Sequence, residues 1–226
     1  MTVTASDNPA PLLEAKGLVK RFQGFPVLRG VDLRVEAGEA VVLYGPNGSG
    51  KTTLLRILAT LSRMDGGTLD IVGESFEERA FVRARMMYCG HGTQLYDDLE
   101  PMENLRFFLS LYGKKVTDED ARTVLERVNL WRFRHFIVGN FSAGMKRRLS
   151  FARAMLLRPS LLLLDEPYTS LDTAGVDMVN TFLAEHIATG SAVVLSNHAA
   201  ERVHQLPHRR VRLAAGVLHE EDPHVV

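Results

Sequence analysis

The sequence predicts an α/β fold with a mainly parallel sheet, and three observations support this class. Short apolar segments suited to strands alternate with segments of helical spacing along most of the 226 residues. A glycine-rich segment near residue 50 joins one such strand directly to a helix. A helix-rich stretch over about 101–157 interrupts the alternation, so we expect an α-helical subdomain inserted into the core.

The first part of the chain is expected to supply several strands. Val31, Leu33 and Val35 alternate with polar residues, which predicts a strand with one solvent-exposed face in an antiparallel N-terminal β part. The run 40–44 is wholly apolar and ends at a glycine, which predicts a buried strand. The other elements expected before the insertion are a helix over 51–61 and strands over 68–72 and 86–89.

The second part begins with the insertion and then returns to alternating strands and helices. Apolar residues at helical spacing predict the helices, and short apolar runs predict the strands. The expected elements are helices over 102–112, 117–128 and 145–157, a strand over 161–164, a helix over 173–187, a strand over 192–196, and a hairpin of 209–213 with 217–220.

Composition fits one globular domain without a membrane-spanning segment. Hydrophobic residues make up 46% of the chain, yet no apolar run approaches the roughly 20 residues that cross a bilayer, so we expect no direct membrane insertion. The 27 basic and 27 acidic residues cancel, and their charge indicates no nucleic-acid partner. The polar start, 1–11, is expected to be a disordered tail before a domain over 12–221.

The glycine-rich segment follows a phosphate-binding pattern. Residues 45–52 read Gly-Pro-Asn-Gly-Ser-Gly-Lys-Thr, which matches G-x-x-x-x-G-K-[ST] between a strand and a helix. Backbone N–H groups and the positive end of the helix would face the β- and γ-phosphates of a nucleotide, and Lys51 adds a charge. The Thr52 hydroxyl suits Mg²⁺, which prefers oxygen. The predicted nucleotide-binding residues here are Gly45, Pro46, Asn47, Gly48, Ser49, Gly50, Lys51, Thr52 and Thr53.

A second motif is an acidic pair at the end of the apolar strand 161–164. Asp165 at the strand end, beside a phosphate loop, would hold Mg²⁺ through water. Glu166 comes next and would point elsewhere, where it could polarise the water that attacks the γ-phosphate. Together with the phosphate loop, this pair favours hydrolysis of a nucleoside triphosphate.

Further segments resemble the ATP-binding subunits of ABC transporters. Residues 141–145, Phe-Ser-Ala-Gly-Met, resemble the family's signature Leu-Ser-Gly-Gly-Gln, and Ser-Leu-Asp at 170–172 resembles its D-loop. His198 resembles the switch histidine, and Phe22 lies where the family has an aromatic residue that stacks on adenine. The resemblance covers about residues 12–218. It implies an ABC-type P-loop NTPase core that binds and hydrolyses ATP, with Mg²⁺ as its metal.

The same resemblance implies a dimer, since family members hold each ATP between the phosphate loop of one subunit and the signature of the other. Asp172 would then lie at the dimer seam, and His198 would bridge Glu166 and the γ-phosphate. The implied catalytic residues are Glu166, His198 and Lys51. The residues implied to contact the partner's ATP are Ser142, Ala143, Gly144 and Met145.

Two motifs depart from the family pattern. The family has a glutamine before the helical insertion that touches Mg²⁺ and senses the permease, but here His91 or Gly92 holds its place and Gln94 is shifted. A neutral imidazole is a poorer partner for Mg²⁺ than an amide oxygen. In the signature, Ala143 and Met145 replace glycine and glutamine. The serine and the second glycine remain, so we expect ATP to be sandwiched still.

The segment 91–113 looks like the ATPase of the cytochrome c maturation exporter, often called a haem exporter. That subfamily has a similar histidine and the same Glu-Asn-Leu followed by an aromatic pair. The resemblance implies a homodimer that powers export through a separate transmembrane permease, on the cytoplasmic inner face of the cell membrane. Permease contact is expected near 91–105, with Asp97 and Asp98 among the contacting residues.

Three other functions stay open at this point. The ATPase of a drug, antibiotic or polysaccharide exporter would carry the same motifs. A non-transport ABC ATPase acting on DNA or ribosomes would have a long coiled-coil insertion or two cassettes, which these 226 residues do not contain. A nucleotide-binding regulator without turnover would not need Glu166. The transported substrate is not identified by the sequence.

Overall fold

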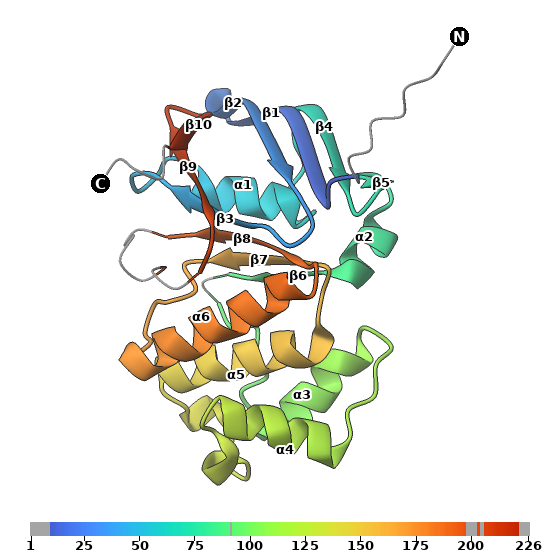
Figure 1. The fold of residues 1–226 in the computed structure, drawn as a ribbon, viewed down its shortest axis with the longest axis vertical. Coiled ribbons are helices and arrows are strands. Elements are labelled where there is room, and N and C mark those ends of the chain that lie inside the picture. The colour runs from blue at the N-terminus through green and yellow to red at the C-terminus, as the bar shows by residue number, and fades with distance from the viewer. Residues whose placement is uncertain (1–9, 91, 198–202, 204–205, 222–226) are drawn as a thin grey trace.

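The computed structural model describes residues 10–90, 92–197, 203 and 206–221, and within them two sheets and six α-helices form a layered α/β structure (Figure 1). The elements in chain order are β1 Leu13–Phe22, β2 Phe25–Val35, β3 Ala40–Tyr44, α1 Lys51–Leu58, β4 Gly66–Ile71, β5 Glu74–Ser75, α2 Arg79–Arg85, β6 Met86–Cys89, α3 Pro101–Ser110, α4 Asp118–Arg127, the 3₁₀ turns η1 Trp131–Phe133 and η2 Val138–Asn140, α5 Ala143–Leu157, β7 Leu161–Asp165, α6 Thr173–Ala188, β8 Ala192–Ser196, β9 Arg209–Ala214 and β10 Val217–Glu221.

The two sheets differ in strand direction. The larger sheet has the order β10-β9-β3-β8-β7-β6, and all its neighbours are parallel except the terminal hairpin of β9 and β10. The smaller sheet, β2-β1-β4-β5, is antiparallel throughout. Both the mainly parallel core and the antiparallel N-terminal part confirm the predicted fold class.

Alternate residues of the central parallel strands pack on opposite faces of the larger sheet. Val42, Leu162 and Leu195 belong to a core shared with α3 to α6. Val41 and Leu163 belong to a second core, shared with α1 and the smaller sheet. Burial on both faces explains why these strands are continuous apolar runs rather than alternating ones.

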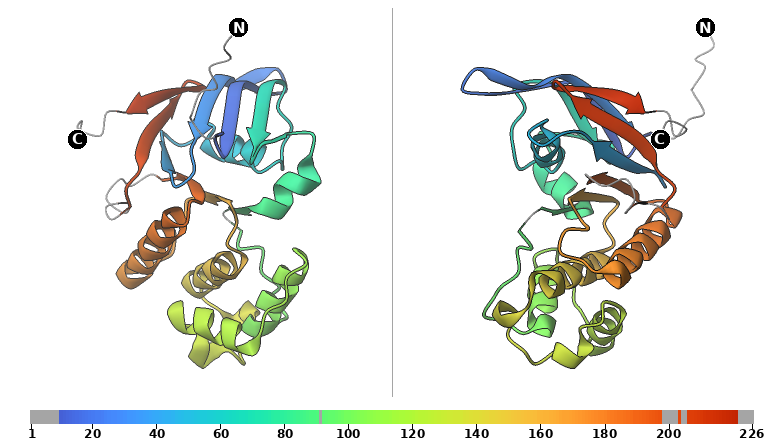
Figure 2. Two further views of the ribbon diagram at one scale, coloured as in Figure 1. Left: turned by 45° about the vertical axis from the view of Figure 1, so that its right-hand side comes forward. Right: turned by 90° about the vertical axis from the view of Figure 1, so that its left-hand side faces the viewer.

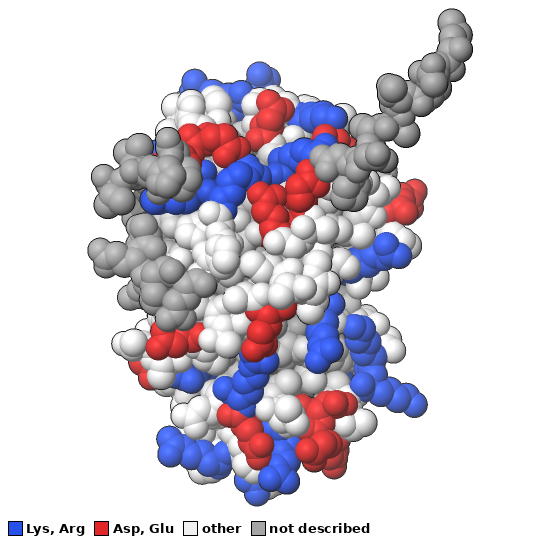
Figure 3. All heavy atoms as spheres, viewed as in Figure 1, with Lys and Arg blue, Asp and Glu red and all other residues white. Residues whose placement is uncertain are grey.

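Helix α1 lies between the two sheets, and α3 to α6 cover the opposite face of the larger sheet (Figures 1 and 2). Helix α2 lies beside β5 and β6, and its buried Val82 packs in the same core as α1. Helices α5 and α6 lie nearest that face, and α3 and α4 lie beyond them as the outer part of the helical subdomain. Among the described residues, no helix is long and apolar enough to cross a membrane. Basic and acidic side chains are interspersed on the face seen in Figure 3.

Most predicted elements are present, with differences that have local causes. The predicted helix over 51–61 ends at Leu58, because Thr60 adopts a left-handed φ of 57°. Strand β1 was not predicted: its pairing with β2 shifts register between Ala15 and Leu18, so its apolar residues do not alternate regularly. Helix α2 is only 7 residues long and has no side-chain cap, so its sequence signal is weak.

Candidate nucleotide-binding site

The glycine-rich loop runs from the end of β3 into α1. Gly45 has φ 145°, and an added Cβ would collide with the Leu213 carbonyl oxygen. Gly50 has φ 104° and immediately precedes the helix, where its Cβ would lie 3.0 Å from Val27 Cγ1. Glycine is therefore required at both ends of the loop, which keeps the backbone close to its neighbours and turns it toward the helix N-terminus.

The ammonium group of Lys51 is drawn back across this loop. Its Nζ atom donates to the carbonyl oxygens of Gly45 at 2.7 Å and Pro46 at 3.0 Å. Burial lowers the pKa of Lys51, and the negative charges of Glu166 and Asp165 only partly oppose that shift. A buried ammonium held at a helix N-terminus is suited to binding phosphate oxygens.

The loop forms one wall of an open hollow of about 480 Å³. Phe22, which was predicted to stack on a base, is half-exposed and forms part of its wall. The Ser49 hydroxyl is buried within the loop and has no hydrogen-bond partner among the described residues. The residues that line the hollow are Phe22, Val27, Asn47, Gly48, Gly50, Lys51, Thr52, Thr53 and Glu166.

The Asp165 carboxylate lies beside this hollow, at the end of β7, and three hydroxyl groups donate to it. Thr52 Oγ1 donates to Oδ2 at 2.8 Å, and Ser196 Oγ donates to Oδ1 at 2.6 Å. The Tyr88 hydroxyl lies 3.5 Å from Oδ2, and burial together with the Asp165 charge raises the pKa of Tyr88 to about 12. The structure thus brings Thr52 and Asp165, the two predicted metal ligands, into direct contact.

Glu166 follows Asp165 but leaves the strand direction. Its φ of 51° is left-handed, an uncommon conformation for a residue with a side chain. Its backbone N–H donates to Ser196 Oγ at 2.9 Å, and its carbonyl oxygen accepts from Arg147 Nη2 at 3.2 Å. The turned backbone places Glu166 in the wall of the hollow, whereas the Asp165 carboxylate contacts Thr52.

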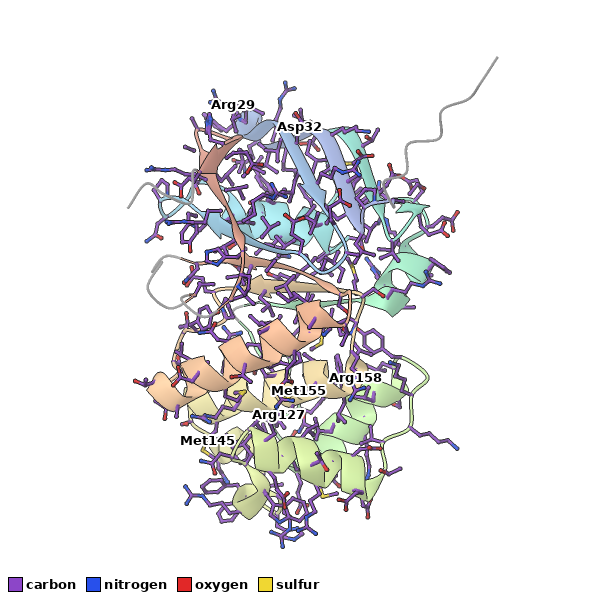
Figure 4. All side chains as sticks on the ribbon, viewed as in Figure 1. Arg29, Asp32, Arg127, Met145, Met155 and Arg158 are labelled. Carbon is purple, nitrogen blue, oxygen red and sulfur yellow. The ribbon has the colours of Figure 1, made fainter. Side chains whose placement is uncertain are left out.

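The signature segment begins α5 and lies on the helical subdomain. Ser142 is the N-cap, and its Oγ accepts from the Met145 backbone N–H at 3.2 Å. Met145 lies below the sheets as drawn in Figure 4. The segment lines a separate hollow of about 490 Å³ whose wall comprises Asn129, Leu130, Arg132, Phe133, Ser142, Ala143, Gly144, Met145, Arg148, Ser170 and Asp172.

Asp172 joins the signature hollow to α6. It is the N-cap of that helix, and its Oδ1 accepts from the Gly175 N–H at 3.0 Å and from Arg148 Nη2 at 2.5 Å. Arg148 and the helix N–H groups lower the pKa of Asp172. The predicted D-loop aspartate therefore lies against the signature helix of its own chain.

The structure describes only some of the residues predicted around the place of the family's glutamine. His91 and His198, the predicted switch histidine, both lie outside the described residues. Gln94 lines a third hollow, a 160 Å³ groove, with Leu61, Arg83 and Tyr88, and does not line the nucleotide hollow. Gly92 is exposed, is not among the residues that line this groove, and lies two residues before Gln94 in the chain.

Several side chains that support the site were not predicted. Ser196 ends β8, and its role could have been anticipated because parallel strands end at one common edge. Arg147 also donates to the Gly90 carbonyl oxygen at 3.0 Å, and Arg153 donates to the Gln94 carbonyl oxygen at 2.8 Å. Both arginines are buried, and their partners are backbone atoms that no sequence motif marks.

A glycine-rich loop between a buried strand and a helix, a lysine across it, and a carboxylate at the end of another parallel strand of the same sheet define the class of P-loop nucleoside triphosphatases. Residues 28–169 match the ABC transporter family. The chain belongs to this family, as one of its ATP-binding and ATP-hydrolysing subunits.

Individual relatives agree with this placement. The cytochrome c biogenesis ATP-binding export protein CcmA of Xanthomonas campestris is 39% identical over 84% of this chain and 88% of its own length. An uncharacterised ABC transporter ATP-binding protein of Bacillus subtilis, YdbJ, is 35% identical over 93% of this chain and 69% of its own.

Solved structures share the fold. An ATP-binding subunit of an ABC transporter superposes with a TM-score of 0.85, at 28% identity over 93% of this chain and 90% of its own. A dimeric ATP-binding cassette in a post-hydrolysis state, bound to ADP and Pi, superposes with a TM-score of 0.81, at 24% identity over 95% of this chain and all of its own.

Proposed function

We propose that two copies of this chain hydrolyse ATP across a shared interface and drive export through a separate permease. The observation that carries the proposal is the separation of two half-sites. The loop hollow and the signature hollow have no lining residue in common, so one chain offers two halves of a nucleotide site rather than one whole site. A two-fold pair would close both sites at once.

The residues present fit Mg²⁺ as the metal. Thr52 Oγ1 and Asp165 Oδ2 lie 2.8 Å apart beside the loop hollow, and both are oxygen donors of the kind that Mg²⁺ takes. Thr52 would bind the metal directly, and Asp165 would hold it through water. When bound, Mg²⁺ would neutralise charge on the β- and γ-phosphates.

The remaining residues divide the chemical work. The loop N–H groups and Lys51 would bind the phosphates, and Phe22 would stack on the base. Glu166, turned into the hollow, would accept the proton of the water that attacks the γ-phosphate. Ser142 and Gly144 of the partner would close over the γ-phosphate. His198 is proposed to assist Glu166, as the family resemblance implies.

Size-exclusion chromatography of Glu166→Gln with ATP and Mg²⁺ tests this function. The amide cannot act as a base, so ATP stays intact and holds the two chains together. We expect the variant to elute as a dimer with ATP and as a monomer with ADP, while the wild type hydrolyses ATP and elutes mainly as a monomer.

The matched control is Glu166→Gln combined with Lys51→Ala, which should remain monomeric at the same ATP concentration because phosphate binding is weakened. If Glu166→Gln binds ATP but stays monomeric at every protein concentration tested, the shared-site proposal is wrong. If it still hydrolyses ATP at the wild-type rate, the role given to Glu166 is wrong.

The permease would dock at the groove that Leu61, Arg83 and Gln94 line, between the sheet core and the helical subdomain. Leu61 is half-exposed there, and Tyr96, two residues after Gln94, is exposed and stacks edge-to-face on the exposed Phe107 ring, with centroids 4.6 Å apart. Exposed apolar side chains beside a groove suit a short helix of a partner. Docking there would place the subunit on the cytoplasmic face of the cell membrane.

The transport task proposed is the export step of cytochrome c biogenesis. The similarity to the cytochrome c biogenesis ATP-binding export protein CcmA of Xanthomonas campestris supports this task, at 39% identity along most of both chains. The resemblance of segment 91–113 to the haem exporter ATPase points the same way. Export of a drug, antibiotic or polysaccharide is the alternative, because the nucleotide site is common to all of these transporters.

Complementation separates the two tasks. We expect this chain to restore covalently haem-bearing cytochromes in a Xanthomonas campestris strain that lacks its own export protein, as read by haem-peroxidase staining of membrane proteins. Glu166→Gln should accumulate to the same level and fail to restore them. Failure of the active chain to restore staining, when it is produced and assembles with the host permease, favours the other exporters.

A further inference from the structure

Tyr88 connects two parts of the molecule that the proposed function uses. It is the third residue of β6, and its hydroxyl oxygen lies 3.5 Å from Asp165 Oδ2. The same side chain forms part of the wall of the groove that Gln94 lines. One half-buried ring therefore extends from the groove to the carboxylate proposed to hold the metal.

The backbone beside Tyr88 is shaped around this ring. A Cβ at Gly90 would lie 2.9 Å from both the hydroxyl oxygen and Cε1 of Tyr88, closer than real Cβ contacts come. Gly90 is also held in place, because its carbonyl oxygen accepts from the buried Arg147 at 3.0 Å. A side chain at 90 would therefore push the Tyr88 hydroxyl away from its place beside Asp165.

The three hydroxyl groups around Asp165 have different positions. Ser196 fixes Oδ1 at 2.6 Å from the neighbouring strand, while Thr52 and Tyr88 share Oδ2. The 3.5 Å separation is at the long limit for a hydrogen bond. Such contacts at reaction sites commonly shorten once ligands bind. Tyr88 alone of the three also reaches the groove.

We propose that Tyr88 is a positioning residue that orients the Asp165 carboxylate through its hydroxyl and links that carboxylate to the groove. The inference rests on the proposed function and deepens it. Tyrosine and phenylalanine differ only in one hydroxyl group. Tyr88→Phe therefore removes the contact with Asp165 and preserves the packing of the ring. The Mg²⁺-dependent step should become slower, while the affinity of the site for the base and phosphates of ATP should stay unchanged.

The test compares Tyr88→Phe with Tyr112→Phe. The Tyr112 hydroxyl lies 3.5 Å from the Met86 carbonyl oxygen, an equally long contact, but it does not touch Asp165. We expect Tyr88→Phe to lower kcat for ATP by about fivefold, the effect of one net hydrogen bond, with KM for ATP within about twofold. Tyr112→Phe should keep both constants.

A second readout does not depend on turnover. In the Glu166→Gln background, light scattering measures the Mg²⁺ concentration at which ATP-dependent dimerisation is half-maximal. Tyr88→Phe should raise that concentration by about fivefold, and Tyr112→Phe should leave it unchanged. Gly90→Ala should reproduce the Tyr88→Phe effect, and combining the two should add little, because both act on the same hydroxyl.

The outcomes separate this inference from the function on which it rests. A Tyr88→Phe protein that matches Tyr112→Phe in kcat and in Mg²⁺ requirement overturns the inference alone. So does an effect of Tyr88→Phe confined to KM for ATP, and so does full additivity with Gly90→Ala. A parent protein that neither hydrolyses ATP nor dimerises as Glu166→Gln overturns the proposed function, and this inference with it.

Discussion

The two small residues at the start of α5 have very different surroundings. Ala143 is exposed, whereas a Cβ on Gly144 would lie 2.7 Å from the Ser170 carbonyl oxygen. Ser170 is itself held in a left-handed conformation with φ 67°. The replacement of the family's first signature glycine by Ala143 therefore falls at an exposed position, and the glycine that remains is the one the packing requires.

Gly144→Ala should therefore destabilise the protein by about 1–3 kcal/mol, since the added methyl must push the Ser170 backbone aside. Ala143→Gly is the matched control and should cost at most about 1 kcal/mol, the helix-propensity difference. Urea unfolding measures both. A Gly144→Ala protein as stable as the wild type would show that the Ser170 backbone moves aside without a free-energy cost.

A second residue-scale prediction concerns proton uptake by Lys51. Burial lowers its pKa in the free protein, so the ammonium form is lost at a lower pH than for an exposed lysine. Bound phosphates favour the ammonium form and raise that pKa again. ATP binding should therefore weaken as pH rises through the free-state pKa of Lys51, and it should take up protons in that range.

Calorimetric titration of ATP in two buffers of different ionisation enthalpy measures this uptake. Lys51→Arg should abolish the part due to residue 51, because a guanidinium group stays protonated over the whole range. An unchanged buffer dependence in Lys51→Arg would assign the uptake to another group.

At the scale of elements, the loops of the site are held by helix α5. Arg147 donates to the carbonyl oxygens of Gly90 after β6 and Glu166 after β7, and Arg153 donates to that of Gln94. Burial lowers the pKa of both arginines, and the Arg153 guanidinium also lies 3.7 Å from the centroid of the Phe108 ring. The helix that begins with the signature thus fixes the loops around the other half-site.

The N-terminus of α6 gives a prediction that separates a cap from an ion pair. Asp172→Ala removes both the cap to Gly175 and the contact with Arg148, and should cost about 1 kcal/mol or slightly more. Asp172→Asn keeps a cap acceptor and should cost less, because an exposed ion pair contributes little. Thermal or urea unfolding at neutral pH checks the order.

The pH dependence of this pair has a defined sign. The folded-state pKa of Asp172 is lowered, so its charge adds stability above the unfolded-state pKa, and that stability is lost as pH falls through the lowered value. The stability difference between the wild type and Asp172→Asn should shrink over that acidic range. A difference that stays constant on acidification would contradict the assigned cause.

Elements with a clear hydrophobic pattern were predictable from the sequence, and contacts between elements were not. Strands 40–44, 86–89 and 192–196 match β3, β6 and β8, because a strand buried on both faces is a continuous apolar run. The loop, Asp165 and Glu166 were predictable because their chemistry needs fixed residue types in sequence. Tyr88, Ser196 and Arg147 act through spacing in three dimensions, which depends on strand order and helix packing.

At the scale of the whole molecule, the proposed permease groove lies where the core meets the helical subdomain. Asp97, in the segment that follows Gln94, accepts from Lys146 at 2.7 Å, and its carbonyl oxygen accepts from the Gly139 N–H. That segment is therefore tied to the start of α5, beside the signature. A movement of the segment around Asp97 should therefore move the start of α5 with it.

Reversing the charge of Asp97 and Asp98 to lysine should weaken binding to the permease while ATP affinity stays unchanged. The measurement is the amount of subunit that sediments with membrane vesicles of the source organism after these are stripped of peripheral proteins. Asp70→Lys, on the exposed side of β4, is the control for surface charge. If the wild type, the charge-reversal variant and Asp70→Lys all sediment equally, the permease contact lies elsewhere than at Asp97 and Asp98.

The separation of the loop hollow from the signature hollow has a genetic consequence. Consider one chain inactivated at Lys51 and another inactivated at Gly144, each unable to support transport in its own homodimer. When they pair, one composite site contains both defects and the other contains neither. Two null alleles of the same gene should thus complement each other partially, whereas two alleles altered in the same hollow should not.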